Sequence, residues 1–414
     1  MPLEDYLPRV KDELTRRGAD PVLSSIEHSL EAYQSAITRA DWKGSRRGPA
    51  VRSALNAIAA ACSKEEAKGV LTGALGGLIK EVQEVQGCWD KDKFKKYNPG
   101  NVGYIKTLEG EGGAEKIYVM KSEVDSKRGA IDRAFKPDTD GYAVKMNGRP
   151  VQKPPAAPGM MGIDDFGSRL SARSVASYKV DKMLGTRVLA RTRFAECTVE
   201  GEQGVLFGSL QNWTGGRSLF DIKEKEGGPD ALKKVYANPK VVEQLQHLQL
   251  VDYLTGQTDR HAKNIHIVGG DKVLGIDHDF SFPSKDMREF IANDEVKNHG
   301  LPKYVSKHVK TAILEMEPSE LKRRIGPYLS VNEIDRTIIR LTELKEALKS
   351  DQIKQVDNWP ELVANGSGLN FTNSYLYSGQ DHLDKTMKNA TLPPPSQTSA
   401  QGGSGAAASA AGSI

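Results

Sequence analysis

Acidic and amide side chains with a fixed spacing occur in the segment that starts at Asp252, DYLTGQTDRHAKNIHIVGGDKVLGIDHDFSF. Asp259 stands five residues before Asn264, and Asp277 follows Asn264 by thirteen residues, at the end of the apolar run VLGI. A carboxylate can accept the proton of an attacking hydroxyl group. An amide oxygen and a second carboxylate are hard ligands that suit Mg²⁺ better than Zn²⁺. These side chains therefore predict transfer of a phosphoryl group from a nucleotide, a reaction that depends on positioning and charge.

A helix, a loop and two strands must position these side chains. Apolar residues recur with a helical period from Pro239 to Leu254, and Gly256 stands where such a helix ends. The short runs IHIV and VLGI are typical of strands, which would bring Asn264 and Asp277 together. A lone Asp or Asn in a polar loop is usually a turn former or a helix cap. The complete order of helix, loop, strand and acid favours a catalytic role instead.

The segments DYLTGQTDRHAKNI and GIDHDFSF resemble the phosphatidylinositol 3/4-kinase-like and actin-fragmin-kinase-like branch of the protein-kinase-like superfamily. In that branch, DRHxxN replaces the motif HRDxxxxN. The resemblance implies that Asp259 is the catalytic base, that Asn264 and Asp277 are the metal ligands, and that His261 packs to hold the loop. It implies ATP and Mg²⁺ as cofactors, and a weaker resemblance extends from Trp89 to Ser350.

A strand upstream should supply a lysine for the nucleotide. The run KIYVMKS offers Lys121 after two apolar residues, and we assign this role to Lys121. The run YAVKMNG offers Lys145 as a second candidate, inside a stretch rich in Pro and Gly. We expect the turn NPGNVG, which contains Gly100 and Gly103, to cover the phosphates.

Two further segments have counterparts in the resembling family. GSLQNWTGG resembles the hinge between the lobes, so the backbone from Ser209 to Gln211 is expected to bond an adenine. The helix predicted from Ser168 to Leu184 lacks the Glu that orients the lysine in kinases, because Ser174 and its neighbours are not acidic. Asp164 or Asp165, ahead of this helix, is the candidate substitute.

The chain has 414 residues, enough for a large two-lobed domain and a smaller module. Helical periodicity without strand signals predicts an all-helical module at the amino terminus, and the mixed pattern that follows predicts an α+β, protein-kinase-like fold. The expected divisions are a helical module (1–88), a catalytic domain (89–365) with a small lobe (about 89–215) and a large lobe (about 216–365), an inserted loop (about 125–162) and a flexible tail (366–414).

Composition limits the classes of partner. Lys and Arg number 58 against 54 Asp and Glu, and the formal charge of +4 is too small to predict a nucleic-acid partner. The three Cys have no C-x-x-C spacing, and no apolar run could cross a bilayer. We expect a cytoplasmic protein. The helical leader and the tail rich in Pro, Ser and Ala are typical of a bacterial effector exported into the cytosol of a host cell.

The leading functional prediction is transfer of the γ-phosphoryl group of ATP to a protein Ser or Thr hydroxyl. One alternative is a phosphoinositide or inositol phosphate kinase, for which Lys285 and Arg288 would contact the head group. A second is a nucleotidyl transferase on the same fold. A third is a pseudokinase that binds a protein partner through its amino-terminal helices, favoured by the missing helix Glu.

Overall fold

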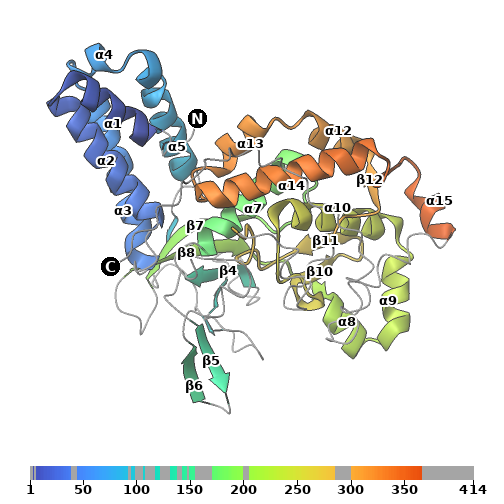
Figure 1. Cartoon of the computed structure of the whole chain (residues 1–414). Helices are drawn as coiled ribbons and strands as arrows, with labels where there is room; N and C mark the ends of the chain where they lie inside the picture. Colours follow the sequence, from blue (N-terminus) through green and yellow to red (C-terminus); the bar gives the residue numbers. More distant parts are fainter. Residues whose placement is uncertain are drawn as a thin grey trace, which may run out of the picture.

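The computed structural model describes the chain over residues 3, 6–38, 44–91, 95–97, 106–107, 117–121, 131–137, 142–146, 149–153, 170–198, 205–284 and 300–365. Within these ranges, helices occupy the amino-terminal part and most of the carboxyl-terminal half, and small sheets lie between them (Figure 1). The mixed helix and sheet composition expected from the sequence is therefore confirmed.

The amino-terminal part consists of helices, as the periodicity predicts. Asp20 starts the second helix, because its Oδ1 accepts hydrogen bonds from the backbone amides of Val22 (2.8 Å) and Leu23 (3.1 Å). The apolar face of this helix is buried, including Ile26 and Leu30. The helices are α1 (Tyr6–Arg17), α2 (Pro21–Thr38), α3 (Gly44–Cys62), α4 (Ala67–Val70) and α5 (Leu78–Lys91), with a short 3₁₀ turn, η2 (Gly73–Leu75).

A six-stranded sheet follows, with the strand order β1-β7-β8-β4-β3-β2. Strand β2 pairs antiparallel with β3, and β7 pairs antiparallel with β8. A separate hairpin joins β5 and β6. The strands are β1 (Lys95–Tyr97), β2 (Lys106–Thr107), β3 (Tyr118–Lys121), β4 (Ile131–Pro137), β5 (Tyr142–Met146), β6 (Arg149–Lys153), β7 (Thr192–Thr198) and β8 (Val205–Asn212).

Strand β4 corrects the expectation that residues 125–162 form an inserted loop. It lies inside the sheet, antiparallel to β3 on one side and to β8 on the other. Phe135 is fully buried against Tyr118, with 6.3 Å between the ring centroids. Lys136 is the next residue and therefore points to the opposite side of the sheet. The strand escapes sequence analysis because its apolar residues are few and its flanks are rich in Gly, Pro and charge.

Helix α7 (Leu170–Leu184) packs against β7 and β8 and confirms the helix expected between the two pairs of strands. Val175 and Val180 are fully buried. Its end is marked by Gly185, whose φ of 71° is a conformation that glycine adopts without steric cost.

Helix α10 (Pro239–Thr255) is the central element of the carboxyl-terminal half and is buried from Leu245 to its end. Asn238 caps its start by accepting a bond from the amide of Lys240 (3.0 Å). The other helices are α8 (Leu219–Lys225), α9 (Gly228–Tyr236), η4 (Ala262–Asn264), α12 (Lys307–Glu315), α13 (Pro318–Ile325), α14 (Val331–Lys349) and α15 (Trp359–Ala364). The strands are β9 (Arg217–Ser218), β10 (Ile265–Val268), β11 (Lys272–Gly275), β12 (Tyr304–Ser306) and β13 (Lys354–Val356).

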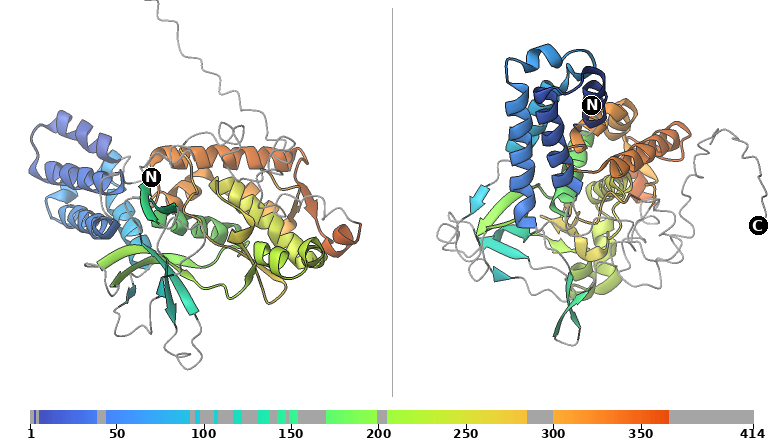
Figure 2. Two further views of the ribbon diagram at one scale, coloured as in Figure 1. Left: turned by 90° about the horizontal axis from the view of Figure 1, so that it is seen from below. Right: turned by 60° about the vertical axis from the view of Figure 1, so that its left-hand side comes forward.

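The sheet lies beside both groups of helices. Helix α3 packs against β8, and Arg52 of α3 forms an ion pair with Glu196 of β7. Figures 1 and 2 show α1 to α5 on one side of the molecule and the helical half, α8 to α15, on the other. No helix in the described ranges has the length and apolar character required to cross a membrane.

Candidate active site

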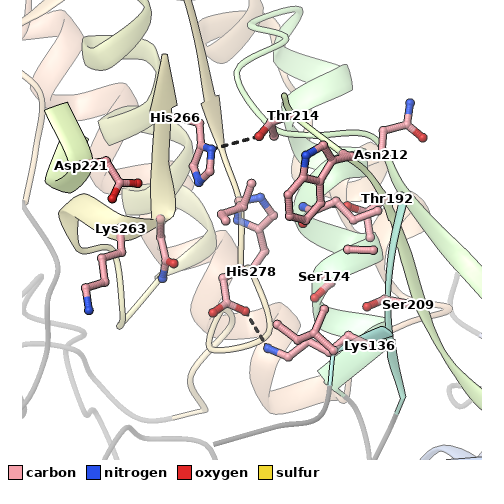
Figure 3. A pocket seen from close by; sticks show the side chains of 17 residues that line it. Lys136, Ser174, Thr192, Ser209, Asn212, Thr214, Asp221, Lys263, His266 and His278 are labelled. Atoms are coloured by element: carbon pink, nitrogen blue, oxygen red, sulfur yellow. Dashed lines mark hydrogen bonds and ion pairs between the residues drawn. The ribbon is translucent and has the colours of Figure 1, made fainter. Parts of the chain in front are cut away.

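A pocket of about 460 Å³ lies between the sheet and the loops that follow α10, within the size range of small-molecule sites. Strands β4 and β8 and the residues just after β8 form one wall (Figure 3). The opposite wall comes from the loop before β10 and from the segment after β11. Helix α7 adds Ser174. Five segments of the chain thus meet at one cavity.

Asn264 is buried at the pocket wall, in the loop that carries Asp259. Its Nδ2 donates to the backbone oxygen of Asp259 (3.1 Å) and lies 3.3 Å from Nε2 of His261. These contacts use the amino group of the side chain, and neither of them uses the amide oxygen. Asn264 is therefore oriented to offer an oxygen to a ligand.

Arg260 joins this loop to the end of α10 and to the segment that precedes Asp277. It is fully buried and forms a two-point ion pair with Asp252, with N–O distances of 2.8 and 3.0 Å. Its Nη1 donates to the backbone oxygens of Asn264 (3.0 Å) and Ile276 (2.6 Å). A planar guanidinium in this position fixes both loops relative to one another.

His278 completes the contacts of Arg260. Nη2 of Arg260 donates to Nδ1 of His278 (2.9 Å), so the proton of the neutral imidazole is on Nε2, which donates to the backbone oxygen of Gly275 (3.1 Å). Burial, together with the positive charge of Arg260, holds the pKa of His278 well below its ordinary value. This histidine has a structural role and is not available as a proton acceptor.

Asp277 has a backbone φ of 62°, a left-handed conformation that Asp and Asn adopt more readily than most residues. Gln257 holds it there, because Nε2 of Gln257 donates to the Asp277 oxygen (2.8 Å) while Oε1 accepts from the amide of Asp259 (3.1 Å). Such strain is concentrated at functional sites and costs about 1–3 kcal/mol. The side chain of Gln257 thus also links the two loops, because it bonds the backbone of Asp259 in one and of Asp277 in the other.

Lys136 of β4 reaches across the pocket to the segment after β11. Its Nζ lies 2.7 Å from Oδ1 of Asp277 and also forms an ion pair with Asp279 (Figure 3 marks the bond to Asp277). Burial alone would raise the pKa of Asp277, but the charge and hydrogen bond of Lys136 outweigh it and hold the pKa well below its ordinary value. The carboxylate is therefore ionised at neutral pH.

The structure brings together four of the residues chosen from the sequence. Ser209, Gln211, Asn264 and Asp277 line the pocket, and the backbone of Asp259 is bonded to Asn264 beside it. Lys121 lies in β3, and its side chain is outside the description. Lys145 lies in the separate β5–β6 hairpin. The remaining candidates fall outside the described residues, and these are Gly100, Gly103, Asp164, Asp165, Lys285 and Arg288.

Lys136 is the site residue that sequence analysis missed. It lies opposite Ser209 in the register of β4 and β8, at the centre of the sheet wall. The tripeptide Ala134-Phe135-Lys136 has the same pattern as the A-I-K of the kinase lysine strand. That pattern was the available signal, but it occurs in a segment whose composition predicts a loop.

The helix wall offers no acid to this lysine. Among the residues of α7, Asp181 is the one carboxylate, and it lies at the far end, where Oδ1 accepts bonds from Thr186 Oγ1 (2.6 Å) and the amide of Val188 (3.0 Å). Ser174 is the α7 residue that lines the pocket. The departure from the kinase pattern expected at this helix therefore holds for the described part of the chain.

Aromatic and basic side chains line the opposite end of the pocket. Trp213, which follows β8, lines the pocket. Thr214 Oγ1 is 3.0 Å from Nδ1 of His266 (Figure 3). Lys263 also lines the pocket, with its ammonium 4.7 Å from the ring centroid of Phe220. A flat aromatic side chain at a pocket wall suits a planar heterocycle.

Within the described ranges, no group of three or more His, Cys, Asp or Glu is arranged to hold a metal ion. Mg²⁺ does not require such a cage, because it is usually held by one or two carboxylates together with substrate phosphates and water. The amide oxygen of Asn264 and the ionised carboxylate of Asp277 are hard ligands in one pocket, and they fit this pattern.

No protein-family model matches this chain, and no curated protein matches it. Among solved structures, it is similar to an apo pseudokinase at 10% sequence identity and a TM-score of 0.26, over 69% of this chain and 98% of that chain. This similarity to a kinase-like structure is weak.

Proposed function

We propose that this chain is an ATP- and Mg²⁺-dependent kinase that transfers the γ-phosphoryl group to the hydroxyl of a protein Ser or Thr. One observation carries the proposal: Lys136 from the sheet meets Asp277 in a pocket that Asn264 also lines. A lysine on the phosphates and two oxygen ligands for Mg²⁺ are the parts that phosphoryl transfer requires.

The order of elements around the pocket supports a two-lobed, protein-kinase-like fold. A strand that carries a lysine near its end (β4) is followed by a helix (α7), two antiparallel strands (β7 and β8), and then a mainly helical half that contains both loops. Kinases arrange their lysine strand, orienting helix and catalytic loop in this order. The motif DRHAKN supports the phosphatidylinositol-kinase-like branch within that superfamily.

We assign the adenine to the end of the pocket near Trp213. Ser209 and Gln211 line the pocket from β8, but the backbone of this strand pairs with β4 and β7 and is not available for the adenine contacts expected from the sequence. The backbone at Trp213 and Thr214, just after β8, can bond the base instead, while the indole ring covers one face. This assignment moves the predicted hinge to the residues that follow the strand.

We assign the phosphates to the end of the pocket near Lys136, which replaces Lys121 in our proposal. Asn264 and Asp277 would hold Mg²⁺, which neutralises charge on the β- and γ-phosphates when it is bound. Asp277 is ionised, as a ligand must be. Lys136 would then exchange its contact with Asp277 for one with a phosphate oxygen.

Asp259 is the proposed base. Gln257 and Asn264 bond its backbone amide and oxygen. Its Oδ2 lies 3.8 Å from Nε2 of His261, the same nitrogen that lies 3.3 Å from Nδ2 of Asn264. The acceptor hydroxyl would pass its proton to Asp259 as its oxygen bonds to the γ-phosphorus and the bond from that phosphorus to the ADP oxygen breaks.

The pseudokinase alternative has one observation in its favour, the absence of an acid on the pocket side of α7. It predicts nucleotide or partner binding without transfer. The lipid-kinase alternative depends on Lys285 and Arg288. An assay that offers protein and lipid acceptors separately distinguishes it from a protein kinase.

The test combines binding and transfer on the full chain. ATP should raise the melting temperature of the wild-type protein more with Mg²⁺ than without, because a ligand stabilises the state that binds it. Asp277→Asn, which tolerates the positive φ, should remove the Mg²⁺ increment. Asp259→Asn should bind Mg·ATP as the wild type does but transfer labelled phosphate at least about 100-fold more slowly.

Labelled ATP is supplied with a protein mixture in one assay and with phosphoinositide vesicles in another. Transfer to protein Ser or Thr is the expected result, whereas transfer to lipid alone would assign the lipid-kinase alternative. A wild-type protein that binds Mg·ATP without any transfer would establish the pseudokinase, and one that does not bind ATP would overturn the proposed site altogether.

A further inference from the structure

Lys136 forms ion pairs with two carboxylates of one loop, Asp277 and Asp279. The two acids differ in exposure, because the side chain of Asp277 is 33% exposed and that of Asp279 only 1%. If Asp277 turns to a metal ion, Asp279 remains as the inner partner of the lysine.

The backbone on the carboxyl-terminal side of Asp279 is fixed by hydrogen bonds to the end of α10. Both the amide and the hydroxyl of Thr258 donate to the oxygen of Phe280 (3.0 and 2.9 Å), and the amide of Phe282 donates to the oxygen of Thr255 (2.6 Å). Asp279 is therefore part of a rigid wall and does not depend on a mobile segment for its position.

Helix α7 is attached to this same loop by a basic residue. Nη1 of the fully buried Arg173 donates to the backbone oxygens of Ser281 (2.8 Å) and Phe282 (2.9 Å), and Arg173 also forms an ion pair with Glu333 of α14. Its neighbour Ser174 lines the pocket. Where a kinase helix presents an acid to the lysine, this helix presents a small hydroxyl and uses an arginine to hold the loop.

We infer that Asp279 is the positioning residue for Lys136 and takes the role that the helix acid has in other kinases. This inference rests on the proposed function, because it gives Lys136 a phosphate to contact. Lys136 would be held between Asp279 and the phosphates while Asp277 binds Mg²⁺. The acid thus comes from the metal-binding loop, and the pairing does not require α7 to move.

The first test is a double-mutant cycle in single-turnover transfer. Asp279→Asn should lower the rate at least about tenfold, because one oriented transition-state donor is lost. In a Lys136→Met background the same change should alter the rate less than about threefold, because the two residues act as a unit. A residue that merely stabilises the fold would lower the rate by the same factor in both backgrounds.

Rescue from the helix is the second test. In the Asp279→Asn protein, Ser174→Glu places a carboxylate at the α7 position that lines the pocket and should recover at least about threefold in rate. Ser174→Gln in the same background, which matches it in size without the charge, should recover nothing.

The outcomes separate this inference from the proposed function. A wild-type protein that fails to bind Mg·ATP overturns the proposed function. A wild-type protein that transfers phosphate, together with an Asp279→Asn variant that is equally fast or an additive cycle, overturns the role of Asp279 alone. If Asp279→Asn is too unstable to assay, the cycle is completed at Asp279→Ser, with the same expectation in the Lys136→Met background.

Discussion

At the scale of single residues, Arg260 illustrates how one side chain fixes both loops of the site. Its five N–H groups meet five acceptors, namely both carboxylate oxygens of Asp252, two backbone oxygens and Nδ1 of His278. A lysine has three donors on a flexible stem and could not reproduce this arrangement. The position of Asn264 and that of Asp277 therefore depend on a residue that does not itself line the pocket.

Lys136 and Lys121 provide a matched pair of lysines on neighbouring strands of one sheet. Lys136→Ala should lower phosphoryl transfer at least about 100-fold, the scale of losing one positioned donor to the transition state. Lys121→Ala should change it less than about threefold, because Lys136 already supplies the lysine that meets Asp277 in the pocket. Initial rates at saturating acceptor measure both, and the reverse ranking would return the nucleotide lysine to β3.

The loop residues could be predicted from the sequence, whereas the lysine could not. Asn264 and Asp277 belong to one contiguous motif whose spacing is set by two short strands, and the structure places both at the pocket. Lys136 comes from a strand recognised by its pairing partners rather than by its own residues. Asp279 was likewise missed, because its role depends on where Lys136 reaches.

At the scale of elements, α10 was predictable because its apolar period, its Asn-Pro start and its terminal glycine are all local signals. Helix α7 was predictable for the same reason. Strand β4 was not predictable, because an interior strand is stabilised by its neighbours, here β3 and β8. The residues of β4 themselves do not indicate which strands pair with it.

Gly256, at the end of α10, supports a prediction about stability. Its φ is 64°, and a Cβ atom there would lie 2.7 Å from Cδ of Pro283 and 2.9 Å from Cζ of Arg340. Gly256→Ala should therefore lower the free energy of unfolding by about 1–3 kcal/mol, from backbone strain and overpacking. Urea denaturation followed by circular dichroism measures the change.

Gly69, in α4, is the matched control. It has ordinary helical φ and open space around the site of a Cβ atom. Gly69→Ala should leave stability unchanged or raise it by up to about 1 kcal/mol, because alanine loses less backbone entropy in a helix. Equal stability of the two variants would mean that the turn after α10 adapts without cost.

At the scale of the whole molecule, the amino-terminal helices and the helical half share a continuous hydrophobic core. Arg52 and Glu196 add an ion pair where α3 meets the sheet. The sequence predicted these amino-terminal helices, but their place beside β8 could not be predicted, because contacts between distant segments leave no periodic signal in either one. The boundary at residue 88 stays a prediction, and α5 continues to Lys91.

His247 connects three elements of the helical half and makes stability depend on pH. From α10, its Nε2 lies 3.0 Å from Oγ of Ser306, and its ring packs edge-on against Trp359 of α15, with 6.3 Å between the centroids. Burial, together with the positive charge of His308, lowers the pKa of His247 to about 3. The folded protein therefore keeps this imidazole neutral at pH values where the unfolded chain, with a pKa of about 6.5, binds a proton.

The contribution of His247 to stability is thus fully present above about pH 6.5 and is lost as the pH falls from there toward the folded pKa. Below about pH 6, His247→Asn should lower the slope of the unfolding free energy against pH by about 1.4 kcal/mol per pH unit. This amount corresponds to the one proton that His247 takes up on unfolding. Urea denaturation at pH 7.5, 6.5, 5.5 and 4.5, roughly one-unit steps across the range where histidine titrates, gives the slope.

His28→Asn, at an exposed position of α2, is the control and should keep the wild-type slope. If His247→Asn also kept that slope, the imidazole would be charged in the folded protein, and the packing of α10 against β12 and α15 would have to admit water.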